Sequence, residues 1–459
     1  MLPVGPTGYG DSPYSGLSAF ALNPLFADLE GRADDLGGGP VDYEATTALR
    51  DRALRKAFAA AAPDPTFDAF VDREASWLAD WALYAALKKA HGGVEWTRWE
   101  EGVRLRRPDA LAEARRAHET EIRFQSWVQW LLDRQWDAFR RDVNARGIGL
   151  VGDLPIFVAH DSADVWQHRE LFDLDAAGMP NAVAGVPPDY FSATGQRWGN
   201  PLYRWARMKA DGYQWWCRRV DKTLTRFDAI RLDHFIGFVR YWRVPAAEPT
   251  ATNGRWMRGP GRDLFDAIAR HLGVSQLPFV AEDLGALTPK VKKLRRALGL
   301  PGIRIVQFAF GDDPQAPTFL PYAHPRNAVV YTGTHDNDTI VGWWRSTVAR
   351  SEGTTTGGDD TRTPEQARRE RGKVTAYLGH EVDAVDVDFV RLAYASAAST
   401  AIVPMQDLLG LSSEARMNRP GRASGNWRWR LDADEATLAR LEHRLADLAR
   451  TFGRSKGEA

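Results

Sequence analysis

Short apolar runs alternate with helical segments through most of the chain after residue 147. Along each run the apolar residues do not alternate with polar ones, as is typical of strands buried on both faces. The runs span 148–158, 227–235, 277–285, 302–310, 327–337 and 400–410. Segments with helical spacing of apolar residues lie between them, such as 261–273 and 288–299. This alternation predicts parallel strands joined by helical crossovers, and therefore an α/β fold.

The remaining sequence is mainly helical in pattern. Helical spacing covers 43–60, 65–91 and 110–146, and Gly92-Gly93 and Gly147 end the last two segments. We predict a single catalytic domain over 1–459, with 43–146 as a mostly helical insertion subdomain. The polar, low-complexity stretch 351–372 is expected to be a mobile surface insertion, and 433–453 an amphipathic helix.

Composition excludes several classes of function. Lys plus Arg equals Asp plus Glu, at 60 each, so no net charge favours nucleic acid or an anionic membrane. There is no apolar run long enough to cross a bilayer. Cys217 is the only cysteine, which rules out an intrachain disulfide and fits a reducing cytosol. A soluble cytoplasmic protein is predicted, with its oligomeric state left open.

Charged residues stand at four of the predicted strand ends. In chain order they are Asp153, then Arg231 with Asp233, then Glu282 with Asp283, then His335 with Asp336. A single acid at a strand end is often a helix cap or an Asx turn. In a (β/α)8 barrel, however, these ends face the same way and surround one pocket. The set therefore indicates a site.

Breaking a glycosidic bond needs this kind of set. A retaining mechanism uses one carboxylate as nucleophile and one carboxylic acid as proton donor, then as base. Arg231 and Asp233 are two apart on a strand and share a face, so the cation can keep the carboxylate ionised. A divalent metal held by acids is the alternative. The sequence contains no Walker loop, HExxH or zinc-type Cys spacing, and we expect neither cofactor nor metal.

Several segments resemble a known family. "RFDAIRLDHF", "AEDLG" and "GTHDNDT" are similar to strand-end segments of the α-amylase-type glycosidases. "LPVGPTGYGDSPY", "GDLPIFV", "GVPPDYFSATGQRWGNPLY" and "SEARMNRPGRASGNWRWR" resemble, more closely, the amylomaltases or 4-α-glucanotransferases. The resemblance runs from residue 2 to about 430, and 185–205 is its most specific stretch.

The resemblance implies roles for individual residues. Asp233 matches the nucleophile, Glu282 the general acid/base, and Asp336 a third carboxylate that holds the hydroxyls of the donor sugar. Residues matching sugar-binding positions beside the nucleophile are Arg231, His335 and Asp153. Further substrate contacts are implied for Tyr190 and Phe191 on a loop over the cleft, Gln196 and Trp198 on the same loop, Tyr9, Ser12 and Tyr14 on an N-terminal loop, and Asn426 beside Trp427. For this last set, core packing or turn formation is an equal alternative.

The implied activity is transfer of an α-1,4-glucan segment to the 4-hydroxyl of another glucan or glucose, with maltooligosaccharides as substrates. The alternatives are a hydrolase of the same clan and an inactive glucan-binding fragment. Family members begin earlier, with a strand containing an "HPTSL"-type segment and a second strand ending in "LP". We therefore expect a (β/α)8 TIM barrel with helical insertions that lacks the first strand and part of the second. A misassigned start codon is favoured over a genuine fragment, since an open barrel exposes strand edges.

Overall fold

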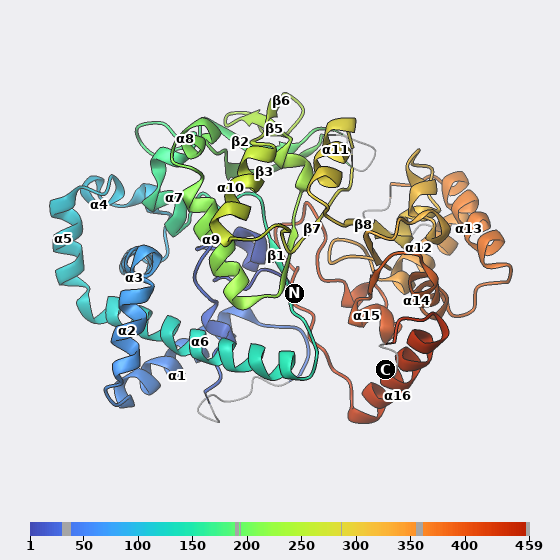
Figure 1. Ribbon diagram of the computed structural model, residues 1–459, viewed down its shortest axis with the longest axis horizontal. Helices are drawn as coiled ribbons and strands as arrows, with labels where there is room; N and C mark the ends of the chain where they lie inside the picture. The colour runs from blue at the N-terminus through green and yellow to red at the C-terminus, as the bar shows by residue number, and fades with distance from the viewer. Residues whose placement is uncertain (30–37, 189–191, 193, 286, 355–360, 456–459) are drawn as a thin grey trace. The chain divides into compact units, whose positions relative to one another are not determined.

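The computed structural model describes residues 1–29, 38–188, 192, 194–285, 287–354 and 361–455 (Figure 1). The chain divides into two compact units: one comprises Met1–Leu36 with Asp42–Gly299, the other Gly37–Val41 with Leu300–Ala459. Within the described ranges, no helix combines the length and the apolar character needed to span a membrane.

Three parallel strands form the centre of the first unit. They are β1 (Val151–Leu154), β4 (Ala229–Leu232) and β7 (Phe279–Ala281), with β4 between the other two. Asp153 pairs with Arg231 in the β1–β4 register, and Leu232 with Ala281 in the β4–β7 register. The crossovers contain α7 (Ala163–Gln167), α8 (Trp205–Ala210), α9 (Gln214–Arg226) and α10 (Arg262–Leu272), and α11 (Pro289–Ala297) follows β7. Parallel strands with helical crossovers are confirmed.

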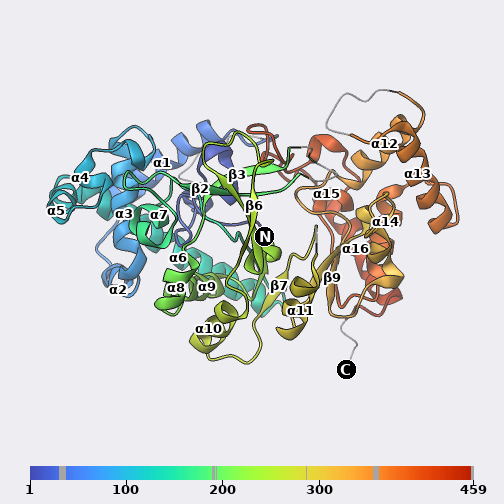
Figure 2. The same ribbon diagram turned by 90° about the horizontal axis from the view of Figure 1, so that it is seen from above.

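A second, antiparallel sheet lies in the same unit (Figure 2). Its order is β3-β2-β5-β6, with bounds β2 (Ala182–Val186), β3 (Gln196–Pro201), β5 (Arg240–Pro245) and β6 (Arg255–Arg258). The sequence did not predict this sheet, because its strands are short and rich in Gly, Arg and Pro. Gln196 and Trp198 therefore lie on a strand, and their expected place on a loop is wrong.

Helices fill residues 43–146. They are α1 (Tyr43–Ala60), α2 (Pro65–Arg73), α3 (Ala75–Ala90), α4 (Glu101–Arg104), α5 (Pro108–Ala117) and α6 (Glu119–Ala145), at the blue and cyan end of the ribbon in Figure 1. The segment 65–91 is two helices, not one, because Glu74 leaves the helical conformation (φ −97°, ψ 8°). Its carboxylate accepts from Trp77 Nε1 at 2.5 Å and pairs with Lys222 at 3.1 Å.

Several aromatic side chains of this helical region lie in its hydrophobic core. Trp81, Tyr84 and Trp99 are buried, and Tyr84 packs with its ring centroid 6.3 Å from Trp81 and 5.4 Å from Trp99. Trp166 of α7 joins the same cluster at 5.9 Å from Tyr84. Burial of large rings is therefore sufficient to explain these aromatic residues, without a ligand.

The second unit has its own three parallel strands, β8 (Gly302–Ile305), β9 (Ala328–Tyr331) and β10 (Thr400–Ile402), with β9 in the middle. Its helices are α12 (Ile340–Ser351), α13 (Pro364–Leu378), α14 (Val385–Ala395), α15 (Met405–Leu408) and α16 (Glu435–Thr451). The expected mobile insertion 351–372 includes residues 355–360, which lie outside the described residues. Its last part begins α13, where Thr363 and Gln366 form a capping box.

Candidate active site

Strand register brings a charged pair together in the first unit. Asp153 of β1 lies opposite Arg231 of β4, and Arg231 Nη1 donates to both carboxylate oxygens, at 2.8 and 2.7 Å. The same nitrogen donates to Asp233 Oδ1 at 3.0 Å. Although burial opposes the charged form, Asp153 and Asp233 raise the pKa of Arg231 above its ordinary value. A permanent cation therefore stabilises the ionised form of Asp233.

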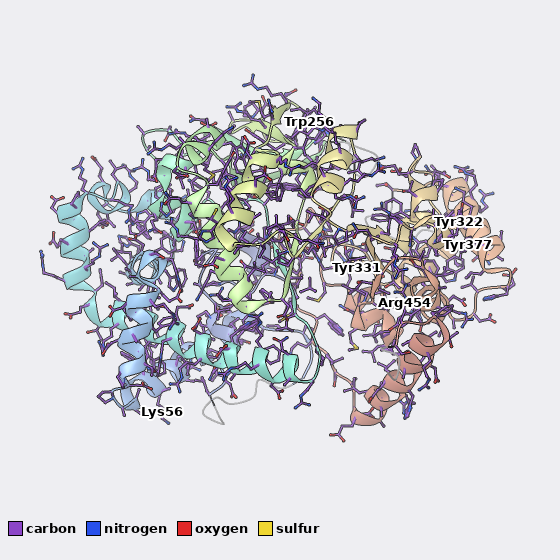
Figure 3. All side chains as sticks on the ribbon, in the orientation of Figure 1. Lys56, Trp256, Tyr322, Tyr331, Tyr377 and Arg454 are labelled. Carbon is purple, nitrogen blue, oxygen red and sulfur yellow. The ribbon has the colours of Figure 1, made fainter. Side chains whose placement is uncertain are left out.

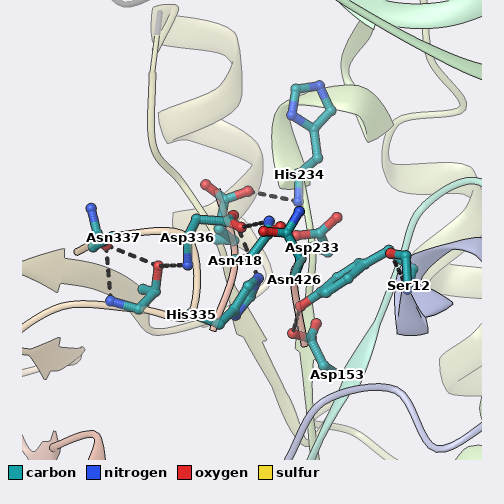
Figure 4. Close-up of polar contacts among 12 residues, drawn as sticks. Ser12, Asp153, Asp233, His234, His335, Asp336, Asn337, Asn418 and Asn426 are labelled. Atoms are coloured by element: carbon teal, nitrogen blue, oxygen red, sulfur yellow. Dashed lines mark hydrogen bonds and ion pairs between the residues drawn. The ribbon is translucent and has the colours of Figure 1, made fainter. Parts of the chain in front are cut away.

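Tyr14 adds a neutral donor to this network. Its hydroxyl donates to Asp153 Oδ2 at 2.6 Å, while its backbone N–H donates to Ser12 Oγ at 3.2 Å (Figure 4). Burial and the charge of Asp153 raise the pKa of Tyr14 well above its ordinary value, so the hydroxyl keeps its proton. Ser12 thus forms the cap of the short 3₁₀ helix that carries Tyr14. Tyr9, in the 3₁₀ helix Tyr9–Asp11 just before it, is 80% exposed.

Glu282 follows β7 and is held against the end of β4. Its backbone N–H donates to the Leu232 carbonyl at 3.0 Å, and its Oε2 accepts from the backbone N–H of His234 at 2.7 Å. Burial, opposed by Arg231 and reinforced by the charge of Asp233, raises the pKa of Glu282 to about 8. Glu282 is therefore protonated at neutral pH. Two carboxyl groups on adjacent strands thus have different surroundings: Asp233 contacts a guanidinium, whereas Glu282 is buried and accepts from a backbone N–H.

His234 is a positioning residue that the sequence analysis missed. Its backbone is left-handed (φ 49°), which turns its N–H toward Glu282. Burial lowers the pKa of its ring to about 4, so the ring is neutral. Trp198 packs edge-on against that ring with centroids 4.9 Å apart, and Trp198 Nε1 donates to Gln196 Oε1 at 3.1 Å. Nothing in the letters "RLDHF" signals the left-handed turn.

The second unit contains the predicted His335–Asp336 pair at the end of β9. Asp336 Oδ1 accepts from Asn418 Nδ2 at 2.6 Å, and Asp336 Oδ2 lies 3.4 Å from His335 Nε2 (Figure 4). The backbone carbonyl of Asp336 accepts from Arg416 at 2.7 Å. The Asp336 side chain is 47% exposed. It is therefore oriented by its neighbours and still open to a ligand.

The residues flanking this pair form the turn that the sequence left as an alternative. Asn337 Oδ1 accepts from the backbone N–H and the hydroxyl of Thr334, at 2.8 and 2.9 Å. Asp338 Oδ2 accepts from Ser413 at 2.7 Å, and Thr339 caps α12. The polar residues after β9 therefore have two functions. Thr334, Asn337, Asp338 and Thr339 build the turn, and the turn presents His335 and Asp336.

Asn426 is occupied within its own loop. The side chain is buried, its oxygen accepts from the Arg419 backbone N–H at 2.9 Å, and its nitrogen donates to the Arg422 carbonyl at 2.9 Å. Trp427 has a left-handed backbone (φ 64°), and its ring lies 5.7 Å from that of His335. Contact of Asn426 with glucan stays a prediction. Asn418, which the sequence analysis passed over, is the amide that contacts a predicted acid.

Two predicted residues, Tyr190 and Phe191, lie outside the described residues. In the first unit, Arg231 is hydrogen-bonded to Asp153 and Asp233 and interacts through its charge with Glu282. Tyr14 is hydrogen-bonded to Asp153 in the same unit. In the second unit, His335 is paired with Asp336. In the part of the chain that the structure describes, no group of three His, Cys, Asp or Glu side chains is arranged to hold a metal ion.

Comparisons with known proteins agree on one family. A family model described as 4-alpha-glucanotransferase matches residues 1–436. The 4-alpha-glucanotransferase of Thermus thermophilus is 48% identical over 454 residues, covering 94% of this chain and 86% of the relative. That of Synechocystis sp. is 43% identical over 457 residues, covering 95% and 86%.

The fold agrees as well. The solved structure of an amylomaltase from Streptococcus agalactiae in complex with acarbose matches with a TM-score of 0.89 and 31% identity, covering 99% of this chain and 91% of that one. The fold is therefore the (β/α)8-barrel type of the amylomaltases, with helical insertions, as the sequence predicted. By its sequence and by its fold, the chain belongs to the 4-alpha-glucanotransferase family.

Proposed function

We propose that this protein transfers segments of α-1,4-glucans by a retaining double displacement, with Asp233 as nucleophile and Glu282 as acid/base. The family is that of a transferase; the roles of the residues are inferred here. They are supported by the single guanidinium of Arg231 that contacts Asp153 and Asp233, next to a Glu282 whose pKa is raised to about 8.

In the first step, Asp233 Oδ attacks the anomeric carbon of the donor sugar as the bond to the leaving 4-oxygen breaks. Glu282 gives its proton to that oxygen, and the shortened glucan departs with a free 4-hydroxyl. Asp233 is suited to attack because Arg231 stabilises its ionised form. Glu282 is suited to donate because burial keeps it protonated.

In the second step, Glu282 acts as the base. It takes the proton from the 4-hydroxyl of an acceptor glucan or glucose, whose oxygen then attacks the anomeric carbon and releases Asp233. The product keeps the α configuration because inversion occurs twice. The backbone N–H of His234 stabilises the ionised Glu282 between the two steps.

The remaining residues hold the sugar. We assign the hydroxyls of the donor glucose to Asp336, supported by its exposure and its orientation by Asn418. Acarbose bound to the S. agalactiae amylomaltase is consistent with an oligosaccharide as substrate here. The loop within 185–203 is assigned to covering the acceptor and excluding water. A cytoplasmic location is inferred from the lone cysteine, Cys217.

Trapping the covalent intermediate tests the two roles together. A Glu282→Gln variant treated with α-maltosyl fluoride, whose leaving group needs no proton, should accumulate a maltosyl-enzyme. Intact mass and peptide mapping should place the added mass on Asp233. The variant carrying both Glu282→Gln and Asp233→Asn should stay unlabelled. A label on any other residue would overturn the assignment of the nucleophile.

A further inference from the structure

Helix α11 carries a cluster of positive charge that the reaction does not use. Its nine residues, PKVKKLRRA, include five cations and no acid. Lys292, Lys293 and Arg296 are exposed, and within the described part of the chain none of them has an acidic partner. Arg296 stands four residues from Lys292 and three from Lys293, spacings at which like charges on a helix repel each other by a few tenths of a kcal/mol. The helix therefore keeps an unfavourable cluster on one side.

The cluster surrounds a hollow. Leu287, Pro289, Lys292, Lys293 and Arg296 line a pocket of about 390 Å³. Leu287 and Pro289 give it an apolar wall, and the three cations provide the rest of the lining. A pocket with an apolar side and three cations in its lining is suited to a small anion that carries a compact organic body.

Arg295, another cation of α11, attaches the helix to the end of β7, next to Glu282. Arg295 Nε pairs with Asp283 Oδ2 at 3.0 Å, and both side chains are nearly inaccessible, at 9% and 2% exposed. Asp283 is the residue after Glu282, at the end of β7. One side of α11 is thus anchored beside the acid's strand, while its exposed cations remain available to a ligand.

We propose that this α11 pocket binds a phosphate ester of a sugar, at a site separate from the glucan-binding residues. The phosphate contacts Lys292, Lys293 and Arg296, and the apolar face of the sugar ring lies on Leu287 and Pro289. Phosphate fits this donor set better than a carboxylate, because it offers three oxygens to three cations. Such a ligand would be made or consumed by reactions that phosphorylate glucose or glucan ends.

Calorimetry with glucose 6-phosphate, inorganic phosphate and glucose as separate probes tests the site. We expect glucose 6-phosphate to bind more tightly than inorganic phosphate, since only the ester reaches the apolar wall, and we expect no heat from glucose at this site. The K292Q/K293Q/R296Q variant should bind glucose 6-phosphate about 100-fold more weakly. Its thermal stability should be equal or higher, because the repulsion within α11 is removed.

A matched variant, R52Q/K56Q/R270Q, removes three exposed cations elsewhere. Lys56 lies on α1 (Figure 3), as does Arg52, and Arg270 lies on α10. The R52Q/K56Q/R270Q variant should bind glucose 6-phosphate with the same affinity as the unmodified protein. Equal loss in both variants, or full binding by K292Q/K293Q/R296Q, would overturn the site. Glucan transfer without phosphate should be the same in all three proteins, which separates this test from that of the proposed function.

The phosphate ester has two sources, a free sugar or a phosphorylated glucan. Competition between glucose 6-phosphate and a maltohexaose carrying a 6-phosphate distinguishes them. Tighter binding of the longer molecule assigns the site to phosphorylated glucan, and equal or weaker binding assigns it to the free sugar phosphate. Failure of both to bind would contradict the proposal.

Discussion

Burial of Glu282 and the contact of Arg231 with Asp233 together determine how the two proposed catalytic acids differ. Its Nη1 contacts Asp233 and Asp153, whereas Glu282 is held by a backbone N–H. Asp233 therefore has a cation at 3.0 Å, and Glu282 has burial and a nearby negative charge. The same functional group, a carboxyl, acquires opposite roles from its surroundings, which sequence alone suggests only through the spacing of Arg231 and Asp233.

The raised pKa of Glu282 predicts a pH-dependent cost to folding. Below about pH 4.5 the carboxyl is protonated in both the folded and the unfolded chain, so it has no effect on stability. As pH rises toward 8, the unfolded chain releases this proton and the folded chain keeps it, so stability falls by up to about 1.4 kcal/mol per pH unit. Glu282→Gln should remove this loss.

Urea unfolding of both proteins at pH 5, 6.5 and 8 measures the effect. The free energy of unfolding of Glu282→Gln, relative to the unmodified protein, should increase from pH 5 to pH 8. Parallel profiles would show that the pKa of Glu282 is ordinary, and would remove the argument that it is the proton donor.

At the level of elements, the antiparallel sheet supports the acid from outside the parallel strands. Trp198 of β3 packs against His234, whose N–H holds Glu282. We expect Trp198→Ala to lower kcat about tenfold by loosening that contact, and Trp198→Phe to restore most of it. Trp256 of β6, labelled in Figure 3, is the control in the same sheet. Trp256→Ala should leave kcat unchanged; equal losses would assign the effect to general sheet stability.

A buried carboxylate joins three elements of the second unit. Asp407 of α15 accepts from the Thr332 hydroxyl after β9 at 2.6 Å and from the backbone N–H of Ile340 in α12 at 2.9 Å. Asp407→Ala leaves both donors without an acceptor, and should cost about 2–4 kcal/mol of unfolding free energy. Asp407→Asn keeps one acceptor and should cost about 1 kcal/mol. Denaturant titration measures both, and equal costs would contradict this account.

The parallel strands could be predicted from the sequence, whereas the antiparallel sheet and Asn418, the partner of Asp336, could not. The six apolar runs each contain a strand, since a continuous apolar run is the signal typical of parallel strands within a sheet. The strand that carries both Gln196 and Trp198, β3, left no such signal. Likewise the sequence named Asp336 but not Asn418, since a residue 82 positions away becomes a partner only through folding.

For the whole molecule, the sequence resemblance predicted the family and the barrel-type fold. The single domain, the missing N-terminal strands and the loop at Tyr190 and Phe191 stay predictions. The proposed reaction uses carboxylates, a guanidinium and backbone donors, so it needs no metal. Activity should therefore be unchanged after EDTA treatment and dialysis. Loss of activity that Ca²⁺ or Mg²⁺ restores would contradict the mechanism.

The most direct measurement is incubation of the purified protein with maltotriose, followed by separation of the products. Transfer predicts free glucose together with a ladder of maltooligosaccharides longer than maltotriose. Asp233→Asn, with unchanged thermal stability, should form these products at least about 10³-fold more slowly. Glucose and maltose without longer products would show hydrolysis, and would contradict the central claim that a glucan, and not water, is the acceptor.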